Sequence, residues 1–404
     1  MRKKKLWFAI LVSALGYFVD VYDIILFSAV RVPSLRDLGF IDTEITSYGI
    51  LLINIQLIGM LFGSITWGIL GDKKGRLSIL FGSIILYSSA TFLNAFVTNI
   101  ETYAILRFLA GFGLAGELGA GITLVNELMP KEQRGYGSML IASAGALGGF
   151  TGGMIGDVFS WKTAYIVGGL AGFALLFLRI GLIESSLFSQ IKSKSHIQRG
   201  NPFLFLKSLP LLKKYLTCLL IGLPFWVFVG IFMALAPEMG RALEVNKPIT
   251  AGLAISMFCF GLTFGNISSG LVSQLFSSRK KALTVYLSTT LAIVIGFLFT
   301  QNMTSQLFYF FCCLMGLSSG SWVVFIMISA EQFGTNIRAT AAITLPNMVR
   351  IMVIPCAAMI ALIKPYTGIV WGVGFISIIS IIMALVAVSF LQESFSTDLD
   401  FVEH

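Results

Sequence analysis

The chain has 404 residues, of which 56% are hydrophobic and only 12% are charged, and its mean hydropathy is +0.89. These values exclude a water-soluble globular protein and indicate an integral membrane protein. A membrane-spanning helix needs about 20 mostly apolar residues, and runs of that length recur along the whole chain. We therefore predict an all-α membrane fold with twelve transmembrane helices, at residues 6–30, 45–71, 77–98, 102–129, 135–158, 162–183, 212–236, 249–276, 282–300, 304–330, 339–363 and 366–391.

The first predicted helix follows a basic N-terminus and resembles a signal peptide. It is too long for one, contains two aspartates and lacks a small-residue cleavage site, so we interpret it as a retained helix. With both termini in the cytoplasm, 19 Lys and Arg residues lie on that side and 6 on the other, as the positive-inside rule requires. This distribution explains the net charge of +9 without a nucleic-acid partner. Arg179, near a cytoplasmic helix end, is expected to extend to the membrane surface.

Two aspartates, Asp20 and Asp23, lie within the apolar stretch YFVDVYDIILF of the first predicted helix. An ionised Asp at the centre of a membrane helix costs roughly 2.5–3.5 kcal/mol, so such residues are expected to be functional. They share one helix face, which we expect to border a central cavity. With Glu117 and Arg107 of the fourth helix, three acids face one arginine, and crowded carboxylates can exchange a proton near neutral pH. Alternatively, Arg107 pairs with an acid only to hold the first and fourth helices together.

The second half of the chain repeats patterns of the first half. Three glycines of the second predicted helix recur in the eighth at an offset of 202 residues: Gly59, Gly63 and Gly68 against Gly261, Gly265 and Gly270. A Glu and an Arg seven residues apart recur at an offset of 204 residues: Glu127 and Arg134 against Glu331 and Arg338. We therefore predict two pseudo-symmetric six-helix bundles, at residues 1–183 and 212–391, with a cytoplasmic linker at 184–211 and a cytoplasmic tail at 392–404.

Two patterns typical of soluble enzymes occur in contexts that do not suit them. GFGLAG at 111–116 matches a dinucleotide-binding pattern without a preceding strand, and GLSSG at 316–320 has no nearby His or Asp to activate its serine. We interpret both as sites of close helix packing. The five cysteines lie in predicted helices without metal-ligand spacing, and the two histidines lie in the linker and at the last residue. We expect no enzymatic activity, no metal and no cofactor.

Arg350 places a positive charge near the middle of the eleventh predicted helix, in the stretch TLPNMVRIMVIP. A cation at this depth needs an anion, which is either a carboxylate of the other half or a bound substrate. Asn347 lies on the same face of that helix. Trp226 in the seventh helix and Trp322 in the tenth are candidates for the walls of a binding site, although tryptophans in such helices are more often packing residues.

GILGDKKGR at residues 68–76 resembles the signature between the second and third helices of the major facilitator superfamily. The matching residues include Gly68, Asp72, Gly75 and Arg76. Residues 107–135 and EQFGTNIRAT at 331–340 are similar to the same superfamily, especially its sugar-porter, phosphate and organic-acid symporter branches. The sequence DVYD, which contains Tyr22, resembles the first helix of phosphate and organic-acid symporters, and the position of Arg350 is similar to that of an arginine in organic-anion members.

The resemblance implies two bundles that rock about a midplane site lined by the first, fourth, seventh and tenth helices, with access alternating between the two sides. It also implies that residues at the cytoplasmic ends form a gate that holds that side shut: Gly68, Asp72, Gly75, Arg76, Glu127, Arg134, Glu331 and Arg338. Asp72 is expected to bind Arg134 or a helix N-terminus. Gln274 occupies the position equivalent to Asp72, so the second half should close more weakly. The alternative is that these charges only set the topology.

The function predicted from these features is proton-coupled symport of a small anionic metabolite, an organic acid or a phosphate-like ion. The expected substrate-binding residues are Arg350, Arg107, Asn347, Tyr22, Trp226 and Trp322, and the expected proton-coupling residues are Asp20, Asp23 and Glu117. The alternatives are a proton-driven exporter of drugs or cations and a sugar or polyol porter. We expect a monomer that spans the bacterial inner membrane many times, uses the proton gradient without a cofactor, and binds no nucleic acid.

Overall fold

The computed structural model describes residues 2–181 and 208–403, and all regular structure in these two ranges is helical. The first half contains α1 (Arg2–Asp37), α2 (Asp42–Lys74), α3 (Arg76–Asn94), α4 (Ile100–Leu114), α5 (Glu117–Leu128), α6 (Arg134–Val158), α7 (Trp161–Leu178) and the short turn η1 (Arg179–Gly181). The second half contains α10 (Leu209–Val227), η2 (Phe228–Phe232), α11 (Ala236–Ala242), α12 (Ala251–Leu275), α13 (Arg279–Phe299), α14 (Ser305–Ser318), α15 (Ser321–Glu331), α16 (Arg338–Ile351) and α17 (Val353–Phe390). The all-α fold is confirmed, whereas most of the predicted linker at 184–211 lies outside the described residues.

Eleven stretches of the described chain are long and apolar enough to cross a membrane. The last of them, Arg338–Phe390, has 53 residues and would be roughly 80 Å long as one helix, more than twice the thickness of the bilayer core. Gly368 interrupts it with a φ of +75°, a left-handed conformation that glycine adopts readily. This stretch therefore crosses twice, and the prediction of twelve spans is confirmed.

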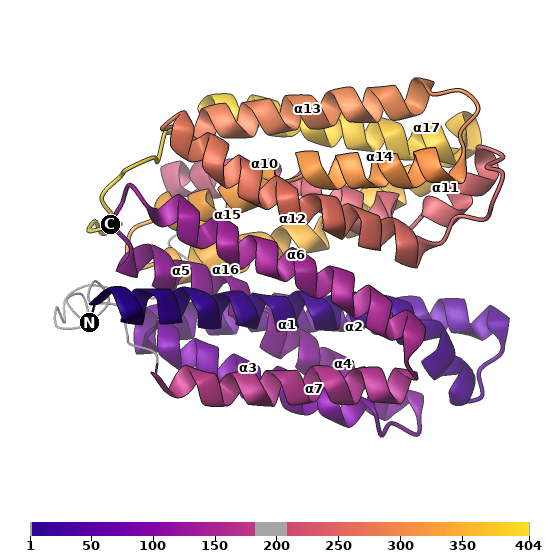
Figure 1. Cartoon of the computed structure of the whole chain (residues 1–404), viewed down its shortest axis with the longest axis horizontal. Helices are drawn as coiled ribbons and strands as arrows, with labels where there is room; N and C mark the ends of the chain where they lie inside the picture. The colour runs from indigo at the N-terminus through magenta and orange to yellow at the C-terminus, as the bar shows by residue number, and fades with distance from the viewer. Residues whose placement is uncertain (1, 182–207, 404) are drawn as a thin grey trace.

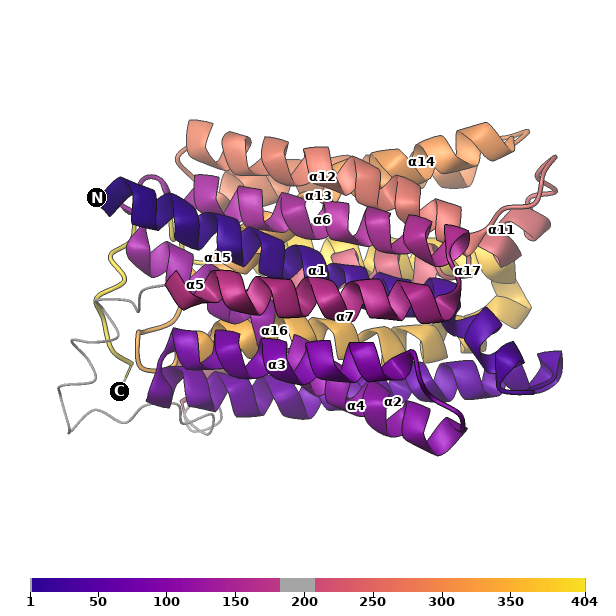
Figure 2. The ribbon, with the colours of Figure 1, turned by 60° about the horizontal axis from the view of Figure 1, so that its bottom comes forward.

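The two halves lie side by side, with their helices running roughly along the long axis of the molecule (Figure 1). The first half occupies the lower part of that view, and most of the second half the upper part. α1 begins and the segment after α17 ends at the same end of the molecule, which the distribution of Lys and Arg identifies as cytoplasmic. α6 packs against α12, and α16 packs against α2, so the halves contact each other through two equivalent helix pairs (Figure 2).

The repeated glycines explain how closely the helices approach within each half. A Cβ atom added at Gly63 of α2 would lie 2.2 Å from the backbone oxygen of Phe112 in α4. A Cβ atom at Gly265 of α12 would lie 2.3 Å from the backbone oxygen of Leu317 in α14. Since neither position has room for a larger side chain, the same packing requirement selects glycine in both halves.

The third glycine of each triplet lies at the interface between the halves. A Cβ atom at Gly68 would lie 2.9 Å from the Cα atom of Thr340 in α16. A Cβ atom at Gly270 would lie 2.7 Å from the Cβ atom of Met139 in α6. The internal repeat read from the sequence therefore corresponds to a structural two-fold relation, in which each half brings one glycine helix close to the other half.

Four of the predicted helices are interrupted rather than continuous, and in the eleventh the break lies at Met352, between α16 and α17. The fourth is broken between α4 and α5 at residues 115–116, and the tenth between α14 and α15 at residues 319–320. The motifs GFGLAG and GLSSG lie at these breaks, and the predicted close packing is confirmed: a Cβ atom at Gly316 would lie 2.0 Å from the backbone oxygen of Phe258. The seventh helix contains Pro224, which removes a backbone donor, and continues as the wide turn η2 before α11.

Candidate functional site

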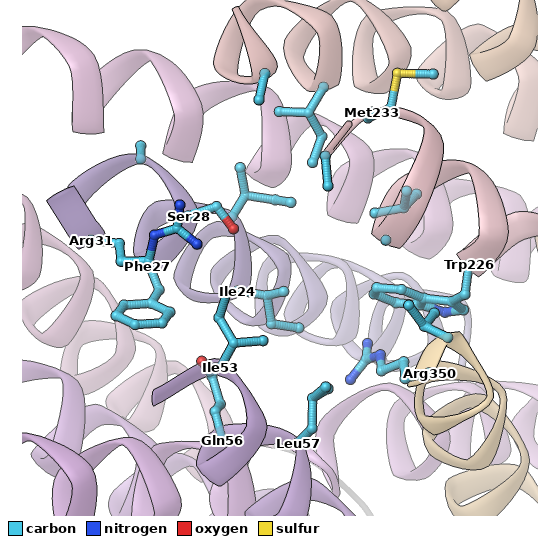
Figure 3. Close-up of a pocket in the computed structure, with 18 of the residues that line it drawn as sticks. Ile24, Phe27, Ser28, Arg31, Ile53, Gln56, Leu57, Trp226, Met233 and Arg350 are labelled. Atoms are coloured by element: carbon cyan, nitrogen blue, oxygen red, sulfur yellow. The ribbon is translucent and has the colours of Figure 1, made fainter. Parts of the chain in front are cut away.

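A cavity of about 390 Å³ lies between the two halves and is lined by α1, α2, α6, α10, η2, α12 and the region where α16 meets α17 (Figure 3). Its α1 residues, from Ile24 to Arg31, come from the half of that helix remote from the cytoplasmic end, and its α2 residues, from Ile53 to Met60, come from the middle of α2. Its α12 residues, from Ala251 to Ile255, are at the beginning of α12, which is also remote from the cytoplasmic end. The cavity therefore lies on the extracellular side. Its wall is mainly apolar, its charged side chains are Arg31 and Arg350, and no Asp or Glu occurs among the described lining residues.

Arg350 of α16 is 4% exposed and contributes its guanidinium to the cavity wall. The Cζ atom lies 4.9 Å from the ring centroid of Trp226, a cation–π contact that Figure 3 shows at one side of the cavity. Nη1 donates to Oδ1 of Asn347 at 3.1 Å and lies 3.6 Å from the sulfur of Met60 in the other half. Within the described chain, no carboxylate lies within ion-pair distance of Arg350, and its Nε has no hydrogen-bond partner.

Asp23 and Arg107 form a buried pair inside the first half rather than on the cavity wall. Oδ2 of Asp23 lies 3.6 Å from Nη1 of Arg107, and Oδ1 accepts a hydrogen bond of 2.7 Å from the hydroxyl of Thr91. The guanidinium lies between the rings of Phe27 and Tyr165, at 5.2 Å and 5.1 Å from their centroids. The structure thus places Arg107 between α1 and α7, enclosed by aromatic rings, and does not bring it to the cavity as a substrate-binding residue.

Glu117 is the first residue of α5 and forms an ion pair with Arg179, which also donates to the backbone oxygen of Leu80. Both side chains are fully buried. The expectation that Arg179 extends to the membrane surface is therefore wrong. The physical reason is that the carboxylate of Glu117 gives the guanidinium of Arg179 a charged partner inside the bundle. The spacing of these residues in the sequence did not reveal this pair.

Asp20 is fully buried, and neither of its carboxylate oxygens has a hydrogen-bond partner in the described structure. The charged groups that interact with it electrostatically are Arg350, Glu117 and Asp23. The expectation that Asp20 and Asp23 face the cavity needs correction, because the cavity wall on α1 begins at Ile24, one helical turn beyond Asp20. Asp20 lies on the cytoplasmic side of this wall, whereas Asp23 is enclosed within the first half. Of these two acids, Asp20 is the one with neither an ion-pair partner nor a hydrogen-bond partner in the described structure.

The other predicted substrate-binding residues occupy different positions. Trp226 lines the cavity, whereas Trp322 is buried behind it, stacked on Phe225 at 4.2 Å and donating to the hydroxyl of Tyr17 at 3.2 Å. The hydroxyl of Tyr22 donates to the backbone oxygen of Ala164, which holds α1 to α7. The amide of Asn347 donates to the backbone oxygen of Ala115 at 3.1 Å, so this side chain connects α16 to the break between α4 and α5. Of these four residues, Trp226 and Asn347 contact Arg350, and Trp226 alone lines the cavity.

Asp72 of α2 binds the N-terminus of α16 in the other half. Its carboxylate accepts from the backbone N–H groups of Ala339 at 3.0 Å and Thr340 at 2.9 Å, and from the Thr340 hydroxyl at 2.7 Å. The two possible partners predicted from sequence were Arg134 and a helix N-terminus, and the structure contains the second. Gly75, which ends α2, has a φ of +107° that permits the sharp turn into α3.

Glu127 connects the two halves through a single carboxylate oxygen. Its Oε1 lies 2.8 Å from Nη2 of Arg76 in its own half and 3.0 Å from Nη1 of Arg338 in the other. Arg338 also donates to the backbone oxygens of Ala330 and Phe333, which fixes its position at the start of α16. We call the interacting groups at this end the cytoplasmic cluster, which includes contacts between the halves and contacts within each half: Asp72, Arg76, Glu127, Arg134, Gln274, Arg279, Glu331 and Arg338.

The second half completes the cytoplasmic cluster with a partner that the sequence analysis missed. Arg279 binds Glu331 through two contacts, Nε to Oε2 at 3.2 Å and Nη2 to Oε1 at 2.9 Å. The repeat contained a signal for this pair, because Arg279 follows α12 in the same way that Arg76 follows α2. Arg134 instead donates to the backbone oxygens of Asn126 and Thr397.

The predicted cytoplasmic tail lies against the cytoplasmic cluster, which the sequence analysis did not foresee. The backbone oxygen of Leu399 accepts from Nη2 of Arg338 at 2.5 Å and from the hydroxyl of Thr335 at 2.7 Å. Asn336 forms two hydrogen bonds with the backbone of Glu403, and the Glu403 carboxylate lies 3.1 Å from Nζ of Lys214. Together with the contact from Arg134, these bonds attach the tail to both halves of the molecule.

A membrane protein of two repeated six-helix bundles, with a cavity between them that is closed at the cytoplasmic end, has the architecture of a secondary transporter. The sequence profile of the Major Facilitator Superfamily matches residues 6–345, and the chain belongs to this family. It is a multi-pass membrane transporter and not an enzyme.

Relatives of known name share about a quarter of the sequence. A Bacillus subtilis (strain 168) protein provisionally named niacin/nicotinamide transporter NiaP is 26% identical over 339 residues, covering 82% of each chain. The benzoate transport protein of Acinetobacter baylyi is 25% identical over 372 residues, covering 83% of this chain and 78% of that protein. The solved structure of the proton:xylose symporter XylE has a TM-score of 0.75 at 14% identity, covering 99% of this chain and 98% of that one, which shows the shared fold.

Proposed function

We propose that the protein is a proton-coupled symporter that imports a small organic carboxylate by alternating access. The observation that carries this proposal is Arg350, a buried guanidinium at the cavity wall with only neutral groups in contact. A buried cation without an anionic partner is unfavourable, so the site favours a ligand that supplies the missing charge. A carboxylate suits a guanidinium because the two groups can form parallel hydrogen bonds.

The remainder of the cavity supports a ring-bearing carboxylate within that class. Trp226 offers a flat aromatic face beside Arg350, and Ile24 and Leu57 provide apolar wall around it. Niacin and benzoate, which appear in the names of two relatives, are each a single aromatic ring with one carboxyl group. An inorganic phosphate-like ion fits this apolar wall less well, since it would leave most of its oxygens without donors.

The composition of the cavity wall weighs against the two alternatives from the sequence. An exporter of cationic drugs needs carboxylates that contact its substrate, and the described wall contains none. A sugar or polyol porter needs several neutral polar groups, and beside the two arginines and the indole of Trp226 the described wall offers the side chains of Ser28 and Gln56.

We assign the transported proton to Asp20. Asp23 and Glu117 already have arginine partners, whereas the oxygens of Asp20 have no hydrogen-bond partner. An ionised carboxylate without partners is costly in such a site, and protonation removes that cost. Because Asp20 is an electrostatic neighbour of Arg350, a change in the charge bound at Arg350 alters the energy of the proton on Asp20, which supplies a physical route for coupling.

In this proposal the cytoplasmic cluster is the closed gate, and the present structure is the outward-facing form. Opening toward the cytoplasm requires Asp72 to leave the N-terminus of α16 and Glu127 to release Arg338. We place the protein in the bacterial inner membrane as a monomer driven by the proton gradient without a cofactor.

The substrate assignment is tested by uptake of labelled benzoate and niacin into proteoliposomes with an imposed pH gradient. Arg350→Ala should abolish saturable uptake and binding, because the carboxylate loses its charged partner. Arg241→Ala is the matched control, since this exposed arginine lies in α11 outside the cavity, and it should transport normally. Undiminished uptake by Arg350→Ala would refute the assignment.

The proton assignment is tested with Asp20→Asn in the same proteoliposomes. This variant should lose accumulation driven by the pH gradient but retain counterflow exchange of substrate, because exchange requires binding and reorientation without net proton movement. Accumulation at the normal level in Asp20→Asn would exclude Asp20. The same pair of measurements on Asp23→Asn shows whether loss of a paired acid has the same consequence.

A further inference from the structure

Arg31 is the second cation of the cavity wall, and neither the fold nor the binding of one carboxylate at Arg350 accounts for it. It lies on α1, on the opposite side of the cavity from Arg350 (Figure 3). Its side chain lies across α2 at Gly49, where an added Cβ atom would be 2.6 Å from Cδ and 3.0 Å from Nε of Arg31. Glycine at this position therefore gives the arginine the space to lie along the cavity wall.

The guanidinium of Arg31 has no charged partner in the described parts of the chain. No carboxylate there lies within ion-pair distance, and its buried Nε has no hydrogen-bond partner. The neighbouring arginine of α1, Arg36, is exposed and lies outside the cavity lining. If Arg31 served only as a charged residue at the extracellular end of α1, its side chain would be expected to extend into solvent as that of Arg36 does.

One face of α2 connects the two cavity arginines. Gly49, Ile53, Gln56 and Met60 follow one another at helical spacing, and the last three line the cavity. Arg31 lies against the first of these residues, and Nη1 of Arg350 contacts the sulfur of the last. Eleven residues of helix correspond to a rise of about 16 Å, which is longer than a carboxylate with a single ring. One such molecule does not bind both guanidinium groups through the same carboxyl group.

We propose that Arg31 forms an outer anion-binding site, which a carboxylate occupies before it reaches Arg350. The site binds small organic anions through their carboxylate group, and its function is to raise their local concentration at the extracellular entrance. A cavity that contains two positive charges, no described acid and a mainly apolar wall focuses its field on incoming anions. The proposal rests on the proposed carboxylate transport, but it concerns the rate of capture and not the final binding contact.

The test is stopped-flow measurement of benzoate association with the full-length protein in detergent, followed by tryptophan fluorescence at low and high ionic strength. Arg31→Gln should slow association about tenfold at low salt and much less at high salt, because electrostatic capture is screened by salt. The KM for uptake should rise in parallel, while the maximal rate stays normal. Arg31→Lys should restore most of the association rate. Arg241→Gln, which removes the same charge from an exposed position on this side, should have little effect.

Two outcomes would overturn this inference without affecting the assignment of Arg350. One is an unchanged association rate in Arg31→Gln at low salt, and the other is an equal loss in Arg241→Gln, which would indicate a general surface-charge effect. If the wild-type protein fails to bind benzoate and niacin and Arg350→Ala behaves normally, the proposed function fails instead. A lower melting temperature of Arg31→Gln together with a normal association rate would assign Arg31 a structural role.

Discussion

The two halves repeat in sequence, yet their acids act differently at the cytoplasmic end. Glu127 of the first half contacts Arg76 of its own half and Arg338 of the other half with the same oxygen. Glu331, its counterpart, binds Arg279 of its own half through both oxygens. The first acid therefore joins the halves, whereas the second stabilises one half internally.

The two equivalent arginines differ in the same way. Arg338 crosses the interface to Glu127, but Arg134 donates to the backbone oxygen of Thr397 in the tail. From the repeat, Arg134 would be expected to pair with Glu331. The tail binds that acid instead, because the hydroxyl of Ser394 donates to Oε2 of Glu331 at 2.8 Å. A neutral contact with the tail thus takes the place of an ion pair between the halves.

Asp72 at the end of α2 and Gln274 at the end of α12 also differ in the contact that they make with a helix N-terminus. Asp72 accepts two backbone N–H groups at the start of α16. Gln274, in the amide orientation that satisfies both of its ends, accepts the N–H of Gly135 at the start of α6 at 3.0 Å. Since a charged acceptor at a helix N-terminus is stronger than a neutral one, the ionic contacts of the first half should hold the cytoplasmic side closed more firmly than their counterparts.

The largest expected effect is that of Glu127→Gln, compared with Glu331→Gln. Removing the charge of Glu127 leaves two buried arginines without their shared partner, at a cost of about 3–5 kcal/mol to the closed form. A cysteine introduced at Ala339, which is buried in the closed form, should become reactive to a thiol reagent added from the cytoplasmic side. Glu331→Gln should instead lower the melting temperature with little change in that labelling. Equal labelling in both variants would contradict the comparison.

The next largest effect is expected from Asp72→Asn, compared with Gln274→Ala. Asn preserves the size of the side chain but removes the charge and one acceptor oxygen from the N-terminus of α16. The expected loss is about 1–3 kcal/mol of the closed form for Asp72→Asn and less than half of that for Gln274→Ala. Labelling at Ala339 measures both, and a larger increase in Gln274→Ala would show that the neutral contact dominates.

These contacts also show how far the sequence could be interpreted. Helix number and the two-fold repeat follow from hydrophobic run length and residue spacing, which are local properties. The contact of Asp72 with a helix N-terminus could be foreseen as one of two possibilities, because an acid at a helix end has few kinds of partner. Arg279 could have been found from the same repeat, since it stands after α12 as Arg76 stands after α2.

The pairing of charges within the membrane could not be foreseen. Arg107 binds Asp23 and Arg179 binds Glu117, but residue spacing does not specify the depth and rotation of helices that are distant in sequence. Once these two pairs are known, Asp20 remains as the acid without a hydrogen-bond partner. The position of the tail could not be predicted either, because the tail is irregular and binds mainly through backbone groups, which leave no pattern in the amino-acid sequence.

Deletion of residues 392–404 removes the tail, which binds Arg134 and Glu331 in place of an ion pair between these two residues. The deletion should make labelling of the Ala339→Cys variant faster by about threefold to tenfold, since several hydrogen bonds are lost but water at this end replaces part of each. Substrate association from the extracellular side should not slow. Unchanged labelling would show that the tail is attached to the closed form without stabilising it. The tail would then not make up for the ion pair that is absent between Arg134 and Glu331.

The smallest effect concerns the pH at which the tail detaches near Glu393. Burial opposes ionisation of this carboxyl group, but hydrogen bonds from the Ser278 hydroxyl and from the backbone N–H groups of Arg279, Phe395 and Lys280 outweigh it and lower its pKa below the ordinary value of 4.5. The ionised form therefore stabilises attachment above that value, and this stabilisation is lost as the pH falls through the lowered pKa. Protease cleavage of the tail should be constant from pH 8 to about pH 5 and should rise only in more acidic buffer. Glu393→Gln should remove that acid-dependent rise, and a rise that begins near pH 7 would exclude Glu393 as its cause.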